Sequence, residues 1–141
     1  MHIAIVGYGK MGHIIRSIAE SLGHTVALTV DIAAKDADCI VKAGDKVAIS
    51  NAISATEIDG IIEFSHPASV IANIEALLPL GIPVVVGTTG WLDKKDYVEN
   101  LVKNIINTDN DNERKYLESK LDLIVYNIYG LTEQEIKTIE L

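Results

Sequence analysis

Short apolar runs alternate along the chain with segments in which apolar residues recur every three or four positions. The runs predict buried strands at about 2–6, 25–30, 60–64 and 83–86. The periodic segments between them predict helices at about 10–22, from Pro67 to a stop at Gly81, and at about 93–106. This alternation predicts an α/β fold, a doubly wound parallel sheet with right-handed crossovers.

Two further regions are less regular. Residues 33–55 suggest a short helix at about 36–41 and a weak strand at 47–50. Residues 107–112 form a polar break, the best candidate linker, which divides the chain into a domain of residues 1–107 and a helical tail of residues 108–141. In the tail, the spacing of apolar residues predicts a helix at about 113–129, and Thr132 and Glu135 form a capping box that starts another.

The tail helix carries a continuous apolar stripe. Its members are Tyr116, Leu117, Leu121, Ile124, Val125 and Ile128. Such a stripe must be buried, either against the sheet or against a second copy of the chain. We therefore expect a homodimer.

The first strand leads directly into a glycine motif, Gly7-Tyr8-Gly9-Lys10-Met11-Gly12. A strand, a glycine turn and a helix N-terminus in this order are typical of a Rossmann-type domain that binds the pyrophosphate of a dinucleotide. In this interpretation Gly7 makes the turn, Gly9 lets the phosphates approach the backbone, and Gly12 lets the helix pack on the strand.

The second part of this fingerprint is an acidic residue about 20 positions further on, at the end of the next strand. Asp31 stands there. An aspartate favours free ribose hydroxyls and repels a 2′-phosphate, so NAD is favoured over NADP, although Lys35 lies close by in the sequence and could offset the repulsion. The alternative is that Asp31 only ends the strand in a turn.

Composition and charge argue against several classes of protein. Of 141 residues, 48% are hydrophobic, and the net charge of −8 argues against a nucleic-acid-binding surface. The single Cys39 excludes an internal disulfide, and no apolar stretch reaches the roughly 18 residues of a membrane span, so we expect a cytoplasmic protein with no membrane contact. The histidines show no metal-ligand spacing, and no metal site is expected.

Three segments resemble the N-terminal domain of the dihydrodipicolinate reductase family, which uses NADH or NADPH in lysine and diaminopimelate synthesis. They are the glycine motif, Glu63-Phe-Ser-His-Pro67, and Gly81-Ile-Pro-Val-Val-Val-Gly-Thr-Thr-Gly-Trp91. The resemblance covers about the first hundred residues, and each motif follows a predicted strand.

The resemblance implies a set of residues that bind the dinucleotide: Gly7, Gly9 and Gly12 for the pyrophosphate, with Tyr8, Lys10 and Met11 giving backbone and packing; Asp31 for the adenosine ribose; Phe64, Ser65 and His66 as cleft lining; and Gly87, Thr88 and Thr89 at the nicotinamide end. The alternative for 87–90 is an ordinary strand-to-helix turn with hydroxyl caps. His66 precedes a helix, where the positive dipole end disfavours protonation, so it is not assigned as a general acid.

The resemblance does not extend beyond about the first hundred residues. Reductases of this family continue into a substrate domain with a histidine pair followed by a lysine, and no histidine follows Trp91 here. We therefore expect the substrate domain and its catalytic residues to be absent, and no catalytic residue is assigned. Residues 120–140 are similar to the end of restriction-modification adenine methyltransferases. Two alternatives to a reductase-type domain stay open: a regulatory cofactor-binding module that self-associates, and a DNA-modification accessory protein.

Overall fold

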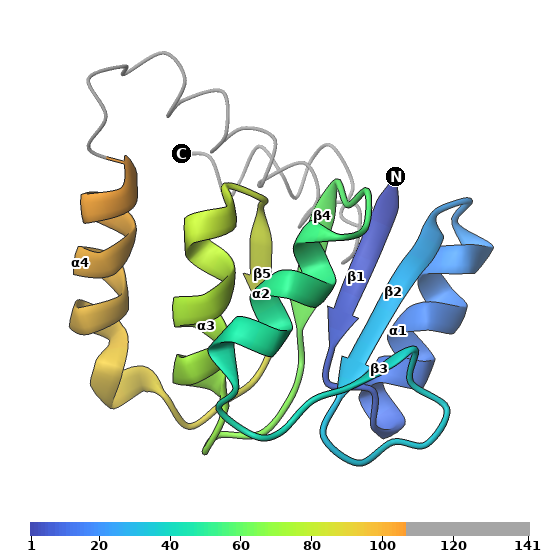
Figure 1. The fold of residues 1–141 in the computed structure, drawn as a ribbon, viewed down its shortest axis with the longest axis horizontal. Coiled ribbons are helices and arrows are strands. Elements are labelled where there is room, and N and C mark those ends of the chain that lie inside the picture. Colours follow the sequence, from blue (N-terminus) through green and yellow to red (C-terminus); the bar gives the residue numbers. More distant parts are fainter. Residues whose placement is uncertain (107–141) are drawn as a thin grey trace, which may run out of the picture. The chain divides into compact units, whose positions relative to one another are not determined.

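In the computed structural model, which describes residues 1–106, strands and helices form one parallel sheet with its covering helices, and they alternate along the chain except where one loop joins two successive strands (Figure 1). The strands are β1 (His2–Val6), β2 (Thr25–Asp31), β3 (Cys39–Ile40), β4 (Gly60–Glu63) and β5 (Val84–Val86). The helices are α1 (Lys10–Ser21), α2 (Lys46–Ser54), α3 (Val70–Leu77) and α4 (Lys95–Ile106), with 3-10 turns η1 (Leu78–Leu80) and η2 (Leu92–Lys94). The α/β class and the Rossmann-type sheet are confirmed.

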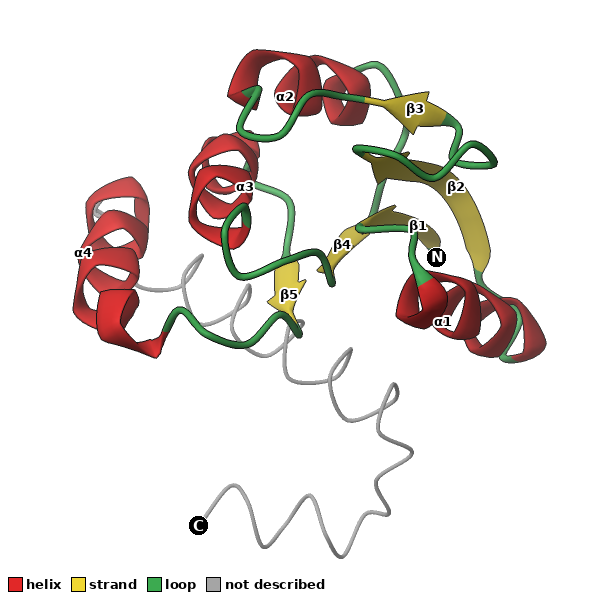
Figure 2. Cartoon of the chain, turned by 90° about the horizontal axis from the view of Figure 1, so that it is seen from below, coloured by secondary structure: helices red, strands yellow, loops and turns green. Residues whose placement is uncertain are grey.

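The strand order within this part of the chain is β3-β2-β1-β4-β5, and every neighbouring pair is parallel. The order reverses between β1 and β4, which is the point where open α/β sheets bind ligands. Figure 2 shows α2 and α3 on one face of the sheet and α1 on the other.

The core lies between the sheet and the helices α2 and α3. It combines strand residues with two isoleucines of α2 and a leucine of α3: Ala4, Val6, Leu28, Val30, Ile61, Ile49, Ile53 and Leu77. A second cluster joins α4 to α3 through Val98, Val70 and Ile74. These packing contacts hold in place the strands whose carboxyl ends carry the candidate functional site.

Residues 33–55 depart from the prediction. The segment 36–41, expected to be a helix, is a loop that leads into β3. The reason is that the Asp38 carboxylate is hydrogen-bonded to β2: its Oδ2 accepts hydrogen bonds from Thr29 N at 2.8 Å and from Thr29 Oγ1 at 2.7 Å. The expected strand at 47–50 is part of α2. Asp45 caps that helix by accepting Ala48 N at 3.0 Å, and Ile49 and Ile53 are buried at helical spacing.

The other elements agree within a few residues. Helix α3 begins at Val70 rather than at Pro67, and the chain leaves η1 through Gly81 with a left-handed φ of +67°. On α1, Gly12 and Ala19 are buried, whereas Ile14 and Ile18 are about half exposed. The predicted linker at 107–112, the tail helices, the apolar stripe and the methyltransferase-like segment lie outside the described residues.

Candidate functional site at the carboxyl ends of the strands

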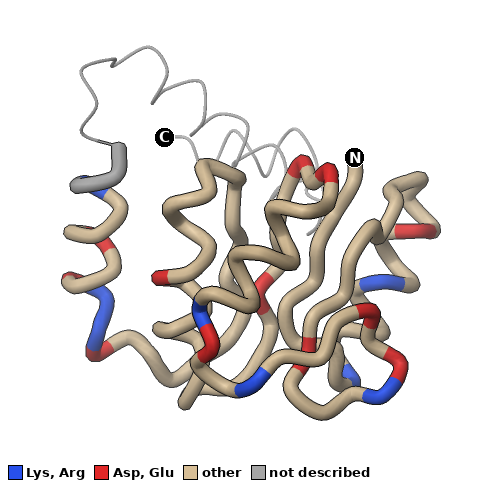
Figure 3. The backbone as a smooth tube through the Cα atoms, viewed as in Figure 1, with Lys and Arg blue, Asp and Glu red and all other residues tan. Residues whose placement is uncertain are grey.

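Backbone hydrogen bonds continue past the strand ends and bring the three sequence motifs to one edge of the sheet. Gly7 N donates to Val30 O at 2.8 Å, Phe64 N to Val6 O at 2.7 Å, and Gly87 N to Glu63 O at 2.8 Å. The glycine turn, the loop after β4 and the loop after β5 therefore start side by side. Charged residues of both signs lie along the loops at this edge (Figure 3).

Two glycines of the motif are required by the protein itself. Gly7 has φ +99°, and a Cβ there would lie 2.2 Å from the carbonyl oxygen of Phe64. A Cβ on Gly12 would lie 2.4 Å from the carbonyl oxygen of Gly7. The glycine turn is thus packed tightly against the loop after β4 on one side and against α1 on the other.

Gly9 differs from both. Its φ of −79° suits any residue, and a Cβ there would meet no atom of the described part of the chain within 4 Å. Gly9 also provides no side-chain cap for α1, and the first turn of the helix contains no acidic residue. The backbone at Gly9 is therefore bare beside a helix N-terminus, an arrangement that suits the close approach of a phosphate.

A cavity of about 180 Å³ lies at this point. Its walls come from the glycine turn, the end of β2, the loop after β3 and the loop after β4 into α3, and they include Gly9, Asp31, Lys42, Gly44, Ser65 and Asn73. The sequence reasoning missed the segment 42–44 and Asn73. The cavity has the components for an anionic, hydroxyl-rich ligand: bare backbone, one carboxylate, one lysine and small polar side chains.

Asp31 lines the cavity, and both of its carboxylate oxygens accept backbone N–H groups. Oδ2 accepts Tyr8 N at 2.7 Å, and Oδ1 accepts Ala33 N and Ala34 N at 2.8 Å each. Burial acts to raise the pKa of Asp31, but the N–H donors of Ala34, Ala33, Tyr8 and Ile32 together hold the pKa below its usual value. The carboxylate is thus charged at neutral pH. It organises the turn after β2, and with three of its roughly four lone-pair sites in use it can accept one further donor.

The loops after β4 and β5 are joined by a buried polar network. Ser65 N donates to Thr88 Oγ1 at 2.7 Å, and the Ser65 hydroxyl donates to Glu63 Oε1. Asn73 Nδ2 donates to the same Glu63 oxygen and to Ser65 Oγ, at 3.0 Å each. Glu63 is fully buried, and within the described part of the chain its Oε2 has no hydrogen-bond partner.

The predicted binding residues fall into two groups. Those that line the cavity are Gly7, Gly9, Asp31, Phe64, Ser65 and His66. Those that do not line it are Tyr8, Lys10, Met11, Gly12, Gly87, Thr88 and Thr89.

Several members of the second group have structural contacts. Tyr8 is buried beneath the turn, Gly87 is covered by the ring of Phe64, and Thr88 is 6% exposed with its hydroxyl accepting Ser65 N. Thr89 is exposed. In the first group, Nδ1 of His66 accepts Ala68 N at 3.2 Å, a contact at the start of the α3 segment.

Within residues 1–106, no cluster of three or more His, Cys, Asp or Glu side chains is placed to hold a metal ion. Among the helices of that region, none has the length and apolar character required to span a membrane.

Residues 1–108 match the family described as dihydrodipicolinate reductase, N-terminus. A 4-hydroxy-tetrahydrodipicolinate reductase of Christiangramia forsetii is 35% identical over 99 residues, which make up 70% of this chain and 35% of that protein. A reductase of the same name from Bifidobacterium longum is 32% identical over 95 residues, 66% of this chain and 32% of the relative. The chain thus spans about a third of the length of these relatives.

Proposed function

The chain belongs to the dihydrodipicolinate reductase family and carries its nicotinamide-dinucleotide-binding domain, and we propose that it holds NAD in preference to NADP for a reductase of this type. In this proposal the cofactor is bound at the cavity between β1 and β4. The substrate named for its relatives, 4-hydroxy-tetrahydrodipicolinate, is the expected hydride acceptor.

The observation that carries the proposal is Gly9. The protein's own packing requires Gly7 and Gly12, but no atom of residues 1–106 and no backbone angle requires a glycine at position 9. Because Gly9 faces the cavity, a ligand that approaches the bare backbone explains its lack of a side chain. The uncapped N-terminus of α1 favours an anionic ligand, and a pyrophosphate meets both conditions.

Each end of the dinucleotide has residues that suit it. Asp31, at the end of β2, is charged and suits the hydroxyls of the adenosine ribose. The loops after β4 and β5 would hold the nicotinamide end, with Phe64, Ser65 and His66 on the cavity wall and Thr89 exposed in the loop after β5. The bound cofactor supplies a hydride, and the role of this domain is to bind and orient it.

The preference for NAD rests on charge. The Asp31 carboxylate would face a 2′-phosphate with like charge, and the nearest following acidic residue, Asp36, is exposed on the same loop. Lys35 and Lys42 are the basic residues of that region, and Lys42 lines the cavity. We expect Asp31 to decide the preference, because its carboxylate lines the cavity and is fixed in place by three backbone N–H groups.

The test is a calorimetric titration of the full chain with NADH and NADPH, in the parent and in Gly9→Val. We expect NADH affinity to fall at least about tenfold, equivalent to about 1.4 kcal/mol, because the valine side chain would occupy the space the pyrophosphate needs. The free energy of unfolding should fall by no more than about 1 kcal/mol, because a Cβ at Gly9 would meet no atom of the described residues within 4 Å and the remaining cost is that of valine replacing glycine as an N-cap residue.

Gly23→Ala is the matched control. Gly23 ends α1 with φ +82° and open space around it, far from the cavity residues in the sequence. Alanine there should destabilise the protein by about 1–2 kcal/mol through its left-handed backbone and leave NADH affinity unchanged. Equal NADH affinity in Gly9→Val and the parent would mean that the glycine motif is only a structural turn, and the proposal would fail.

A further inference from the structure

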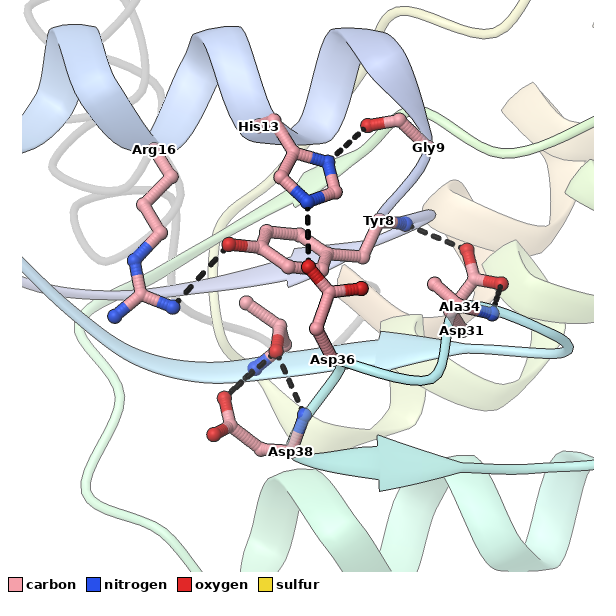
Figure 4. A network of polar contacts seen from close by, with 9 residues as sticks. Tyr8, Gly9, His13, Arg16, Asp31, Ala34, Asp36 and Asp38 are labelled. Atoms are coloured by element: carbon pink, nitrogen blue, oxygen red, sulfur yellow. Dashed lines mark hydrogen bonds and ion pairs between the residues drawn. The ribbon is translucent and has the colours of Figure 1, made fainter.

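His13 links the glycine turn to the loop after β2, two segments that are also joined by the hydrogen bond from Tyr8 N to Asp31 Oδ2. Its Nδ1 lies 2.8 Å from the carbonyl oxygen of Gly9, and its Nε2 lies 2.8 Å from Oδ2 of Asp36 (Figure 4). The ring stacks on Tyr8, with centroids 4.2 Å apart and planes 24° from parallel. The imidazole therefore has a fixed place over the glycine turn.

Both partners of the ring are acceptors. A carbonyl oxygen and a carboxylate oxygen can only accept hydrogen bonds, so each ring nitrogen must carry a proton for both contacts to form. Neutral imidazole has only one N–H. The arrangement in Figure 4 is thus complete only when His13 is an imidazolium, and loss of a proton breaks one of its two bonds.

The charges around the ring agree with this. The Gly9 carbonyl and the Asp36 carboxylate raise the pKa of His13 above its usual value of 6.5, against smaller opposing effects of desolvation and of Arg16. The hydrogen bond from His13 lowers the pKa of Asp36, and the nearby charge of Asp31 acts in the opposite direction. Arg16 itself is held by Tyr8 Oη at 3.3 Å and by Glu20 Oε1 at 2.8 Å.

One end of the link belongs to the cavity wall, and the other lies in a loop that begins at that wall. Gly9 lines the cavity directly, and Asp36 follows Asp31, which lines it and anchors the first part of the same loop. We propose that His13 is a positioning residue for the cofactor: as an imidazolium it fastens the loop after β2 to the glycine turn and places a positive charge beside Gly9. Dinucleotide binding and His13 protonation then favour each other, an inference that rests on the proposed function.

The direction of the pH dependence follows. The link is complete below the pKa of His13 and is lost as pH rises through that pKa, which lies above 6.5. NADH should therefore bind about two- to fivefold more tightly at pH 6 than at pH 9, the range expected for one solvent-exposed positive charge near a phosphate. By linkage, saturation with NADH should move the titration of the His13 ring to higher pH.

The experiment has two independent parts. In the first, NMR follows the ring protons of His13 through a pH titration of the full chain without cofactor, in the parent and in Asp36→Asn. We expect the parent His13 to titrate above 6.5 and the Asp36→Asn protein to titrate at lower pH, with the backbone amides of 33–36 shifting in step with the parent ring.

In the second part, NADH affinity is measured by calorimetry from pH 6 to 9 in the parent, in His13→Gln and in the control His24→Gln, which lies beyond the other end of α1. Glutamine donates a hydrogen bond but does not titrate, so the pH dependence should be lost in His13→Gln and kept in the control. The same pH profile in His13→Gln and the parent would refute the proposal.

The two proposals fail in different ways. If no variant binds NADH at any pH, the proposed function is wrong, while the first titration still decides whether the link exists. If NADH binds but the His13 ring titrates at or below 6.5 in the parent, the link is absent and the inference is overturned while the proposed function stands.

Discussion

Thr88 has a role in the structure that can be separated from cofactor contact. Its side chain is 6% exposed, and its hydroxyl accepts the backbone N–H of Ser65 at 2.7 Å. Thr88→Val keeps the shape and replaces that acceptor with a methyl group. The Ser65 N–H is then left unpaired in a partly buried place, which costs about 1–3 kcal/mol of unfolding free energy. Urea denaturation of the full chain measures this loss.

Hydrogen exchange locates the cause. In Thr88→Val the Ser65 amide should lose protection, whereas in Thr88→Ser, which keeps the Oγ atom, that amide should stay protected even though the lost methyl group lowers overall stability. The exposed neighbour provides the control, because Thr89→Val should change stability by less than about 0.5 kcal/mol. If Thr88→Val is as stable as the parent and instead loses NADH affinity, the hydroxyl serves the ligand and the structural argument is wrong.

Two other predictions concern cofactor choice and assembly. Asp31→Ala should weaken the binding of both NADH and NADPH, because three backbone N–H groups lose their acceptor. The diagnostic quantity is therefore the ratio of the two affinities, which should shift severalfold toward NADPH. An unchanged ratio in calorimetry would argue against contact between Asp31 and the ribose. Light scattering should find the full chain to be a homodimer. Leu121→Glu puts a charge into the apolar stripe of the tail sequence and should shift the protein to the monomer. A monomeric parent protein would contradict the predicted homodimer.

The sequence predicted those elements that carry either a continuous apolar run or a helical spacing of apolar residues over several turns. Strands β1, β2, β4 and β5 are apolar runs, and α1 and α4 are each 12 residues long, so their signals are strong. Strand β3 has two residues and therefore no period at all. Its position depends on Asp38 reaching back to Thr29, a tertiary contact that no local window contains.

The prediction of a strand at 47–50 failed for a related reason. Four residues are too few to separate alternation from helical spacing, and Ile49 and Ile53 show the helical pattern only when the window is extended to 54. Asp45, the residue that caps α2, was the available signal.

The sequence alone also cannot distinguish the roles of Thr88 and Thr89. Adjacent threonines in a turn carry no information about which hydroxyl is buried and which is exposed.

The glycine motif shows how far a sequence pattern reaches and where geometry must take over. Gly7, Gly9 and Gly12 are equivalent letters in the pattern, yet a Cβ would collide with backbone at positions 7 and 12 and with nothing at position 9. A fold that used this turn only to pack α1 on β1 would need the first and third glycines and would tolerate any residue at the second. The glycine that the protein does not need is therefore the one whose substitution separates a binding site from a structural turn.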